Sequence, residues 1–281
     1  MESRKLIGLL ILPLLTSCAY DLDFRGVLTT EVPVNDRFEI SREWTAMNGE
    51  EDEIPVGGNG YHVLIGGDSH VGGTDNLSSL IARGIEGGAA FISIAGDLTT
   101  GREEDYEICA QELASAGDLP VFTVPGNHDL YFGGWESFYA YFGASSYTVS
   151  VRNADTSDLF IFLDTGGGTL GSDQLNWLQE LLKEKRGNYR HAIVITHVNF
   201  IRNRFTGSTN PLNQELLVLY DLFARYNIQF VIQGHDHKRY IEQFGNTVYI
   251  TLDAMFDGYK DASYLELRID GENLEYSFTE F

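Results

Sequence analysis

Five short apolar runs in this chain each stop at a residue that can bind a metal ion. The runs are rich in β-branched residues, as is typical of strands buried on both faces of a sheet. The residues that follow them are Asp68-Ser69-His70, Asp97, Asn127-His128-Asp129, His197 and His235-Asp236-His237. In open α/β sheets, ligands bind beyond the carboxyl ends of the strands. We therefore expect the five strand ends to converge on one edge and to build one site.

The spacing within these blocks favours shared metal ions. Asp68 and His70 are two positions apart, and so are His235 and His237. Side chains at i and i+2 of extended backbone point to the same side, so each pair could reach one ion or two adjacent ions. A glycine precedes the first ligand residue in four of the blocks and would allow a sharp turn there. One such block alone is a weak indication, because a lone histidine is often a core residue, but five blocks at strand ends are much more specific.

Strands and helices alternate from about residue 61 onward, which predicts an α/β fold. Helices are predicted at residues 75–85, 102–116, 134–142, 172–185 and 211–226. Besides the five runs, strands are predicted at residues 147–151 and 159–163, and antiparallel strands at residues 239–242, 247–252, 263–269 and 274–278. No internal repeat interrupts this pattern, so a single large unit is expected.

The order of the five blocks resembles the calcineurin-like metallophosphoesterase family, over about residues 61–281. The runs Leu163-Asp164-Thr165 and Gln174-Leu175-x-Trp177-Leu178 are also similar to that family. The resemblance implies a four-layer α/β/β/α sandwich, in which two mixed sheets are flanked by helices. It further implies two divalent metal ions. The first would be held by Asp68, His70, Asp97 and His237, and the second by Asp97, Asn127, His197 and His235.

Physical reasoning supports such a layout. Two nearby cations repel each other, so a shared carboxylate is needed between them, and Asp97 is the one acidic residue in its block. Asn127 would add a neutral oxygen, which leaves the ions Lewis-acidic. Nitrogen and oxygen ligands without cysteine suit manganese, zinc or iron.

The resemblance implies a hydrolase that cleaves phosphomonoesters or phosphodiesters, with a hydroxide that bridges the two metals as the nucleophile. It places His128 near the leaving group, where an imidazolium could stabilise the transition state or act as general acid. Asp129 is a second catalytic candidate that could orient His128 or raise its pKa. The alternative for Asp129 is a structural role as a cap of the turn.

The substrate stays open between phosphomonoesters, phosphodiesters and nucleotides. Arg202 and Arg204 follow His197 and could grip a phosphate, although they could equally be solvated loop charges. Tyr131, Phe132 and Trp135 could form an apolar or base-stacking wall, or else the buried stripe of a helix. Two other functions also stay open. One is a non-catalytic, surface-anchored binding module on the same fold, which would need a broken ligand set. The other is a single-metal enzyme for a non-phosphate ester.

The net charge is −22, with 41 acidic and 19 basic residues among 281. Such a balance argues against a basic face for nucleic-acid binding, and most of the acidic residues are expected at the solvated surface. The sequence indicates no particular protein partner.

The first 18 residues are predicted to be a signal peptide rather than part of the fold. Arg4 and Lys5 precede a ten-residue apolar stretch, which is too short to span a bilayer as a stable helix. Leu15-Thr16-Ser17-Cys18 resembles the lipobox of bacterial lipoproteins, which implies cleavage before Cys18 and lipid attachment to its sulfur. A plain secretion signal is the alternative. We expect an extracytoplasmic lipoprotein anchored to a membrane of the bacterial cell envelope, with residues 19–60 as an acidic extension or tether and residues 61–281 as the catalytic domain.

Overall fold

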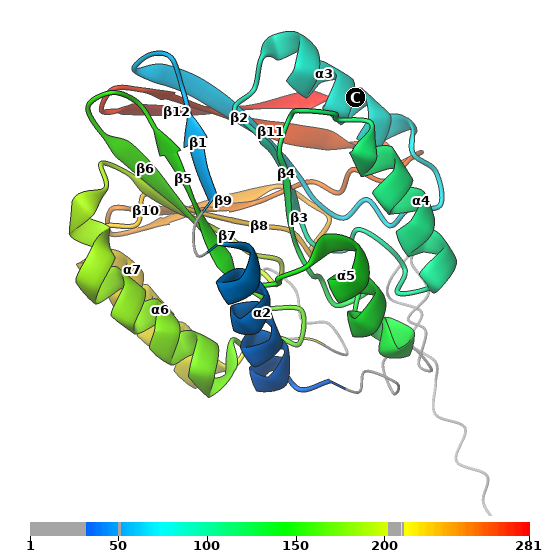
Figure 1. Ribbon diagram of the computed structural model, residues 1–281, viewed down its shortest axis with the longest axis horizontal. Coiled ribbons are helices and arrows are strands. Elements are labelled where there is room, and N and C mark those ends of the chain that lie inside the picture. The colour runs from blue at the N-terminus through cyan, green and yellow to red at the C-terminus, as the bar shows by residue number, and fades with distance from the viewer. Residues whose placement is uncertain (1–31, 50–51, 202–208, 210) are drawn as a thin grey trace, which may run out of the picture.

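The computed structural model describes residues 32–49, 52–201, 209 and 211–281, which form two β-sheets packed face to face between layers of helices (Figure 1). The first sheet has seven strands in the order β1 (Asp52–Pro55), β5 (Tyr147–Arg152), β6 (Ser157–Phe162), β7 (Ala192–Ile195), β8 (Phe230–Gln233), β10 (Thr247–Thr251) and β9 (Tyr240–Phe244). The second has five, in the order β12 (Asn273–Glu280), β11 (Ser263–Asp270), β2 (Gly60–Gly66), β3 (Ile92–Ala95) and β4 (Val121–Val124). Both sheets mix parallel and antiparallel pairs.

Helices cover the outer face of each sheet. Helices α3 (Asp75–Gly87), α4 (Glu103–Ala114) and α5 (Trp135–Phe142) pack on the five-stranded sheet, and α6 (Gly171–Lys185) and α7 (Asn213–Arg225) pack on the seven-stranded sheet. Successive side chains of the central strands alternate between two buried faces. Val63 and Ile65 of β2 face the layer between the sheets, whereas Leu64 faces α3. The predicted four-layer sandwich of two mixed sheets flanked by helices is therefore confirmed.

The fold begins earlier than residue 61. Helix α2 (Val34–Asn48) packs on α6 and β5, and β1 pairs in parallel with β5 at the edge of the seven-stranded sheet. Residues 52–55, which lie within the expected acidic extension, form β1. The interpretation of the whole segment 19–60 as an extension is thus too broad, because residues 34–48 and 52–55 are part of the sandwich. Residues 52–55 become a strand because they pair with β5, and the local composition of the segment does not show this pairing.

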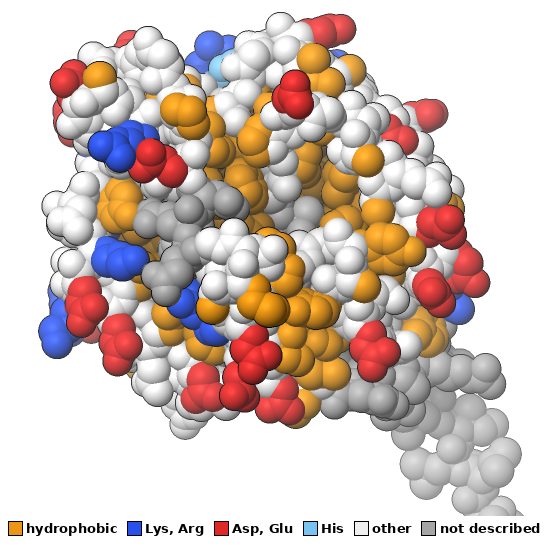
Figure 2. Space-filling view, in the orientation of Figure 1, with side chains coloured by type: hydrophobic (Ala, Val, Ile, Leu, Met, Phe, Trp, Pro, Cys, Tyr) orange, Lys and Arg blue, Asp and Glu red, His pale blue; other side chains and the backbone are white. Residues whose placement is uncertain are grey.

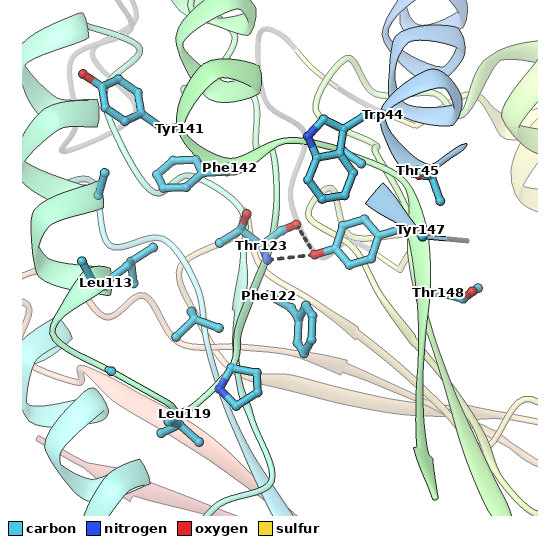
Figure 3. Close-up of a pocket in the computed structure, with 17 residues that line it drawn as sticks. Trp44, Thr45, Leu113, Leu119, Phe122, Thr123, Tyr141, Phe142, Tyr147 and Thr148 are labelled. Atoms are coloured by element: carbon cyan, nitrogen blue, oxygen red, sulfur yellow. Dashed lines mark hydrogen bonds between the residues drawn. The ribbon is translucent and has the colours of Figure 1, made fainter. Parts of the chain in front are cut away.

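The edge of β4 is protected by a side chain of the other sheet. The Tyr147 hydroxyl on β5 accepts a hydrogen bond from the Thr123 backbone N–H (3.0 Å) and donates one to the Thr123 carbonyl (2.8 Å), as Figure 3 shows. This contact lies beside a cavity of about 470 Å³, whose wall includes the aromatic rings of Trp44, Phe122 and Phe142. Unpaired backbone groups on an edge strand can pair with another chain. At Thr123 the Tyr147 hydroxyl already occupies both backbone groups.

Many charged side chains lie on the outside, as the composition predicts, whereas Arg37, Asp97 and Asp164 are buried. Figure 2 shows acidic side chains spread over the face drawn, with apolar side chains around a hollow near its centre. Cys109 on α4 is fully buried against the five-stranded sheet.

Candidate metal centre

The strand-end residues come together, but from two sheets rather than one edge. Strands β2, β3 and β4 of the five-stranded sheet lead to Asp68 with His70, to Asp97 and to Asn127. Strands β7 and β8 of the seven-stranded sheet lead to His197 and to His235 with His237. The two sheets pack face to face, so their carboxyl ends meet at one end of the sandwich. The prediction of a single sheet edge was wrong, although the prediction of one shared site holds.

The potential ligands form two groups that share one carboxylate. Asp68, His70, Asp97 and His237 make the first group, and Asp97, His197 and His235 make the second. In each group the ligand atoms all lie within 4.8 Å of one another. Asn127 adds its Oδ1 to the second group, 3.3 Å from His197 Nε2. All seven residues that the sequence predicted as metal ligands are therefore brought together.

The shared group is a single oxygen of Asp97. Its Oδ2 lies 3.3 Å from His197 Nε2 on one side and 3.7 Å from His70 Nε2 on the other. Its Oδ1 accepts a hydrogen bond from the His128 backbone N–H (2.7 Å), which fixes the carboxylate plane. The geometry thus matches the bridging role expected of Asp97.

The backbone reaches the site by tight left-handed turns. Eight non-glycine residues of the described chain have positive φ, and five of them are ligand residues: Asp68, His70, Asp97, His235 and His237. Extended backbone was expected to align the pairs two residues apart, but both members of each pair are in the left-handed region. Non-glycine residues adopt it at a cost of about 1–3 kcal/mol each. Strain concentrated at one place is typical of functional sites, where the surrounding structure maintains it.

Hydrogen bonds behind the ligands hold their reactive atoms inward. His197 Nδ1–H donates to the Ala95 carbonyl (2.9 Å), so that Nε2 faces the second group. The Asn127 amide donates to the Tyr131 hydroxyl (3.0 Å), which directs its oxygen toward His197. The His235 backbone N–H donates to both carboxylate oxygens of Asp68, at 3.0 and 3.1 Å. These contacts orient the ligands before any ion binds.

The protonation of the site suits metal binding. Burial lowers the pKa of His70 to about 3, which leaves a lone pair on its ring nitrogen at neutral pH. Burial would also lower the pKa of His197, but the Asp97 carboxylate outweighs it and raises this pKa to about 9. For Asp97, burial raises the pKa, but His197 and His128 overcome that effect and hold it well below its usual range. A divalent ion would thus replace the proton on His197 and neutralise two buried carboxylates.

Close contacts between atoms that carry lone pairs support the fit to metal ions. His70 Nε2 lies 3.1 Å from His237 Nε2, and the latter lies 3.3 Å from Asp68 Oδ1. Nitrogen and oxygen lone pairs that face one another at such distances need a proton or a cation between them. Within the described part of the chain, the ion-pair partners of Asp68 and Asp97 are all histidines. The donor set of imidazoles, carboxylates and one amide fits two divalent ions such as manganese, zinc or iron.

The predicted catalytic residues differ in their placement. The His128 ring packs edge-on against His70 (4.6 Å between centroids) and beside Tyr131 (4.7 Å), at the rim of the metal site. Burial lowers the pKa of His128, although the Asp97 carboxylate opposes this shift. Without bound phosphate, the ring therefore favours its neutral form, whereas the sequence suggested the imidazolium.

The carboxylate of Asp129 points into the backbone of two loops. It accepts hydrogen bonds from the backbone N–H groups of Leu98 (3.1 Å), Thr99 (2.8 Å) and Gly126 (2.8 Å), and from the Thr99 hydroxyl (2.9 Å). These bonds agree with the structural role considered for Asp129, because they connect the loop that carries Asp97 to the loop that carries Asn127. Asp129 therefore positions both loops that carry the candidate ligands Asp97 and Asn127.

A cavity of about 440 Å³ opens beside the metal site. His70 and His128 form its floor on the metal side, and the rest of its wall comes from Gly72, Gly73, Thr100, Arg102, Tyr131, Phe132, Phe256 and Asp257. Tyr131 and Phe132 thus belong to the wall, as one of the two interpretations proposed. Trp135 follows the other interpretation, because it is a buried residue at the start of α5.

Some predicted residues lie outside the described part of the chain, and some residues at the site were not predicted. Arg202, Arg204 and Cys18 belong to the first group. Arg102 and Phe256 belong to the second, since both line the cavity. Arg102 follows the Asp97 block by five positions, so the reasoning applied to Arg202 could have identified it. Phe256 carries no comparable signal, because it follows a strand that contributes no ligand.

Comparison with known proteins agrees with this geometry. The sequence profile of the calcineurin-like phosphoesterases matches residues 61–239. Among solved structures, a dimetal phosphatase from Danio rerio aligns with a TM-score of 0.62 and 11% identity, over 78% of this chain and 97% of that one. GAP50, the anchor in the inner membrane complex of Plasmodium, aligns with a TM-score of 0.62 and 13% identity, over 79% of this chain and 84% of its own. At sequence identities this low, the structural similarity shows a shared fold and no more. No curated protein sequence matches the chain significantly.

Proposed function

Because this chain belongs to the calcineurin-like phosphoesterase family, we propose that it is a dinuclear metal-dependent phosphohydrolase that cleaves phosphomonoesters or phosphodiesters. The observation that carries the proposal is the pair of ligand groups that meet at Asp97 Oδ2. A single-metal enzyme would not need a second complete group. A binding module without activity would be expected to have lost ligands, whereas all seven predicted ligand residues are present at this site.

The chemistry follows from the placement of the residues. When bound, two divalent ions would acidify a water for attack on phosphorus and neutralise the phosphate oxygens. Asp97 would hold both ions, while Asp68, His70 and His237 hold one and Asn127, His197 and His235 hold the other. His128 lies at the rim between this centre and the cavity. Negative charge on a bound phosphate would favour the protonated ring, which could then donate its proton to the departing alkoxide.

A direct test combines metal analysis with hydrolysis assays. The purified protein would be loaded separately with manganese, zinc or iron, its metal content counted, and aryl phosphate monoesters and diesters supplied as substrates. We expect two ions per chain and metal-dependent release of the phenol. A protein that binds one ion, or that binds two and hydrolyses neither ester, would contradict the proposal.

Replacing His128 with alanine should lower kcat by roughly 10²–10⁴-fold on alkyl phosphates, while the bound metal stays unchanged. The loss should be smaller on esters of acidic phenols, which leave without a proton. His62→Ala is the matched control, because His62 lies 4.0 Å from Glu266 and outside both ligand groups. Full turnover of alkyl phosphates by the His128 variant would refute the assignment of general acid.

We also propose that the mature protein is a lipoprotein anchored through Cys18, on the outer side of a bacterial membrane. The proposal is supported by the apolar stretch and the lipobox-like sequence that precede this cysteine. None of the helices in the described part of the chain has the length and apolar character needed to span a bilayer.

Cys18→Ala should therefore move the protein from the membrane fraction to the soluble fraction. Loss of the acylated sulfur removes the acyl chains that provide durable attachment. Cys109→Ala, which alters the other cysteine of the chain, should stay with the membrane. The test is the distribution of each variant after cell fractionation, and membrane retention of the Cys18 variant would exclude the lipid anchor.

A further inference from the structure

The cavity beside the metal centre carries one basic side chain among the described residues that line it. That side chain is Arg102, which stands at the start of α4 and is exposed. The cavity also contains the carboxylate of Asp257, whose oxygens accept the backbone N–H groups of Asp75 and Asn76 at 2.9 Å. The start of α3 thus partly neutralises that carboxylate. A guanidinium is unusual here, because acidic residues outnumber basic ones by more than two to one in the whole chain.

The Arg102 guanidinium lies over the ring of Phe132, with its central carbon 4.4 Å from the ring centroid. A cation over an aromatic face is attracted by the ring quadrupole. Phe132 itself has φ of 56°, a left-handed conformation that is costly for an aromatic residue. Phe132 and Phe256 both line the cavity, so the ring supports the guanidinium from within the wall.

The loop that carries Arg102 is fixed against the loop that carries His128. At Gly101, a Cβ atom would lie 2.5 Å from the His128 carbonyl oxygen and 2.6 Å from that of Tyr131, so only glycine fits. Asp129 joins the same two loops through its bonds to Thr99 and Gly126. The position of the Arg102 backbone relative to the metal centre is therefore determined by packing.

We propose that Arg102 forms a second anion subsite, and that the preferred substrates are phosphate esters whose leaving group carries an additional carboxylate or phosphate. This inference rests on the proposed function. In that function the metal ions take the scissile phosphate, next to His70 and His128. Arg102 shares the cavity with both histidines but stands at its mouth, where the leaving group of a bound ester would lie. A guanidinium offers several N–H donors in a planar fork that matches a carboxylate or a phosphate.

Two non-hydrolysable probes test the subsite independently of turnover. Phenylphosphonate and 4-carboxyphenylphosphonate differ only in the second anionic group, and calorimetry gives their Kd values on the metal-loaded protein. We expect the carboxylated probe to bind the wild-type protein about tenfold more tightly, as for one charge-assisted contact. In Arg102→Gln this preference should vanish, with the affinity for phenylphosphonate unchanged. The wild-type preference should also weaken at high salt, because the contact is exposed.

Two further variants sharpen the test. Arg102→Lys keeps the charge without the planar fork and should retain part of the preference. Arg42→Gln is the matched control, since Arg42 is likewise stacked on an aromatic ring, 5.8 Å from the Trp177 centroid, but does not line the cavity. This control should preserve the full preference.

Equal binding of the two probes by the wild-type protein, or equal weakening of both in Arg102→Gln, would overturn the subsite. Failure of the proposed function would appear differently, as absent hydrolysis of phosphate esters by the metal-loaded protein. Preferential binding of the carboxylated probe without hydrolysis would therefore support the subsite while rejecting the phosphohydrolase.

Discussion

Asp97→Ala should abolish metal binding at both positions and lower phosphoesterase activity by roughly three orders of magnitude or more. The Asp97 carboxylate is 1% exposed, and its Oδ2 is the one ligand atom that belongs to both groups. Without it, two cations would face each other across an uncharged gap. The four histidines of the two groups offer only ring nitrogens, and the Asp68 carboxylate belongs to one group alone, so none of them supplies a bridging oxygen. The expected result is simultaneous loss of both ions, measured by elemental analysis, and of turnover.

The comparison variants decide what the loss means. Asp221→Asn removes one negative charge from the exposed face of α7, where Asp221 pairs with Arg225, and should leave the metal content and the activity intact. His235→Ala removes a ligand of one group only, so it should lower the metal content toward one ion per chain. If the Asp97 variant keeps two ions, the carboxylate is not the bridge.

Arg37→Met should lower the free energy of unfolding by about 3–5 kcal/mol. Arg37 is 2% exposed, and its Nε and one terminal nitrogen donate to the two oxygens of Asp164 at 2.8 and 3.0 Å. A third nitrogen donates to the Val32 carbonyl at 2.7 Å. Removal of the guanidinium leaves the Asp164 carboxylate buried without its counter-charge, which is the most costly way to break such a pair. Denaturant unfolding of the metal-free protein measures the change.

A double variant separates the ion pair from the packing of α2. In Arg37→Met combined with Asp164→Leu neither charge of this pair remains, so we expect most of the lost stability to return. Recovery should be incomplete, because Asp164 also accepts the Gly166 backbone N–H at 3.1 Å. Arg42→Met, on the same helix but not fully buried, should cost well under about 1 kcal/mol. A loss in Arg37→Met no larger than in Arg42→Met would show that the pair contributes little.

This ion pair also connects α2 to the metal centre. Gly166, which Asp164 holds, packs so closely on the Asn127 loop that a Cβ atom there would lie 2.8 Å from the Gly126 carbonyl oxygen. Helix α2 thus stabilises a loop that supports the candidate ligand Asn127. Nothing in the composition of residues 34–48 indicated this role, because the partner of Arg37 lies 127 positions away.

The amino-acid sequence alone indicated which residues could bind metal ions, and it determined the class of the fold. Short β-branched runs favour strands, the apolar stripe of a helix repeats every three or four residues, and imidazole and carboxylate groups can bind metal ions wherever they lie. The seven predicted ligands Asp68, His70, Asp97, Asn127, His197, His235 and His237 therefore meet as expected. The sandwich of two sheets followed from the order of these blocks through the family resemblance.

The directions of individual side chains were decided only in three dimensions. Which sheet each strand joins depends on pairing between distant residues, so the ligands arrive from two sheets instead of one. Left-handed turns at Asp68 and His237 replace the extended backbone that local spacing suggested. The Asp129 carboxylate turns to backbone amides, and Arg102 reaches the cavity because Gly101 packs on a loop that follows a different strand. Local periodicity records which face of an element is apolar, whereas these contacts depend on how whole elements pack.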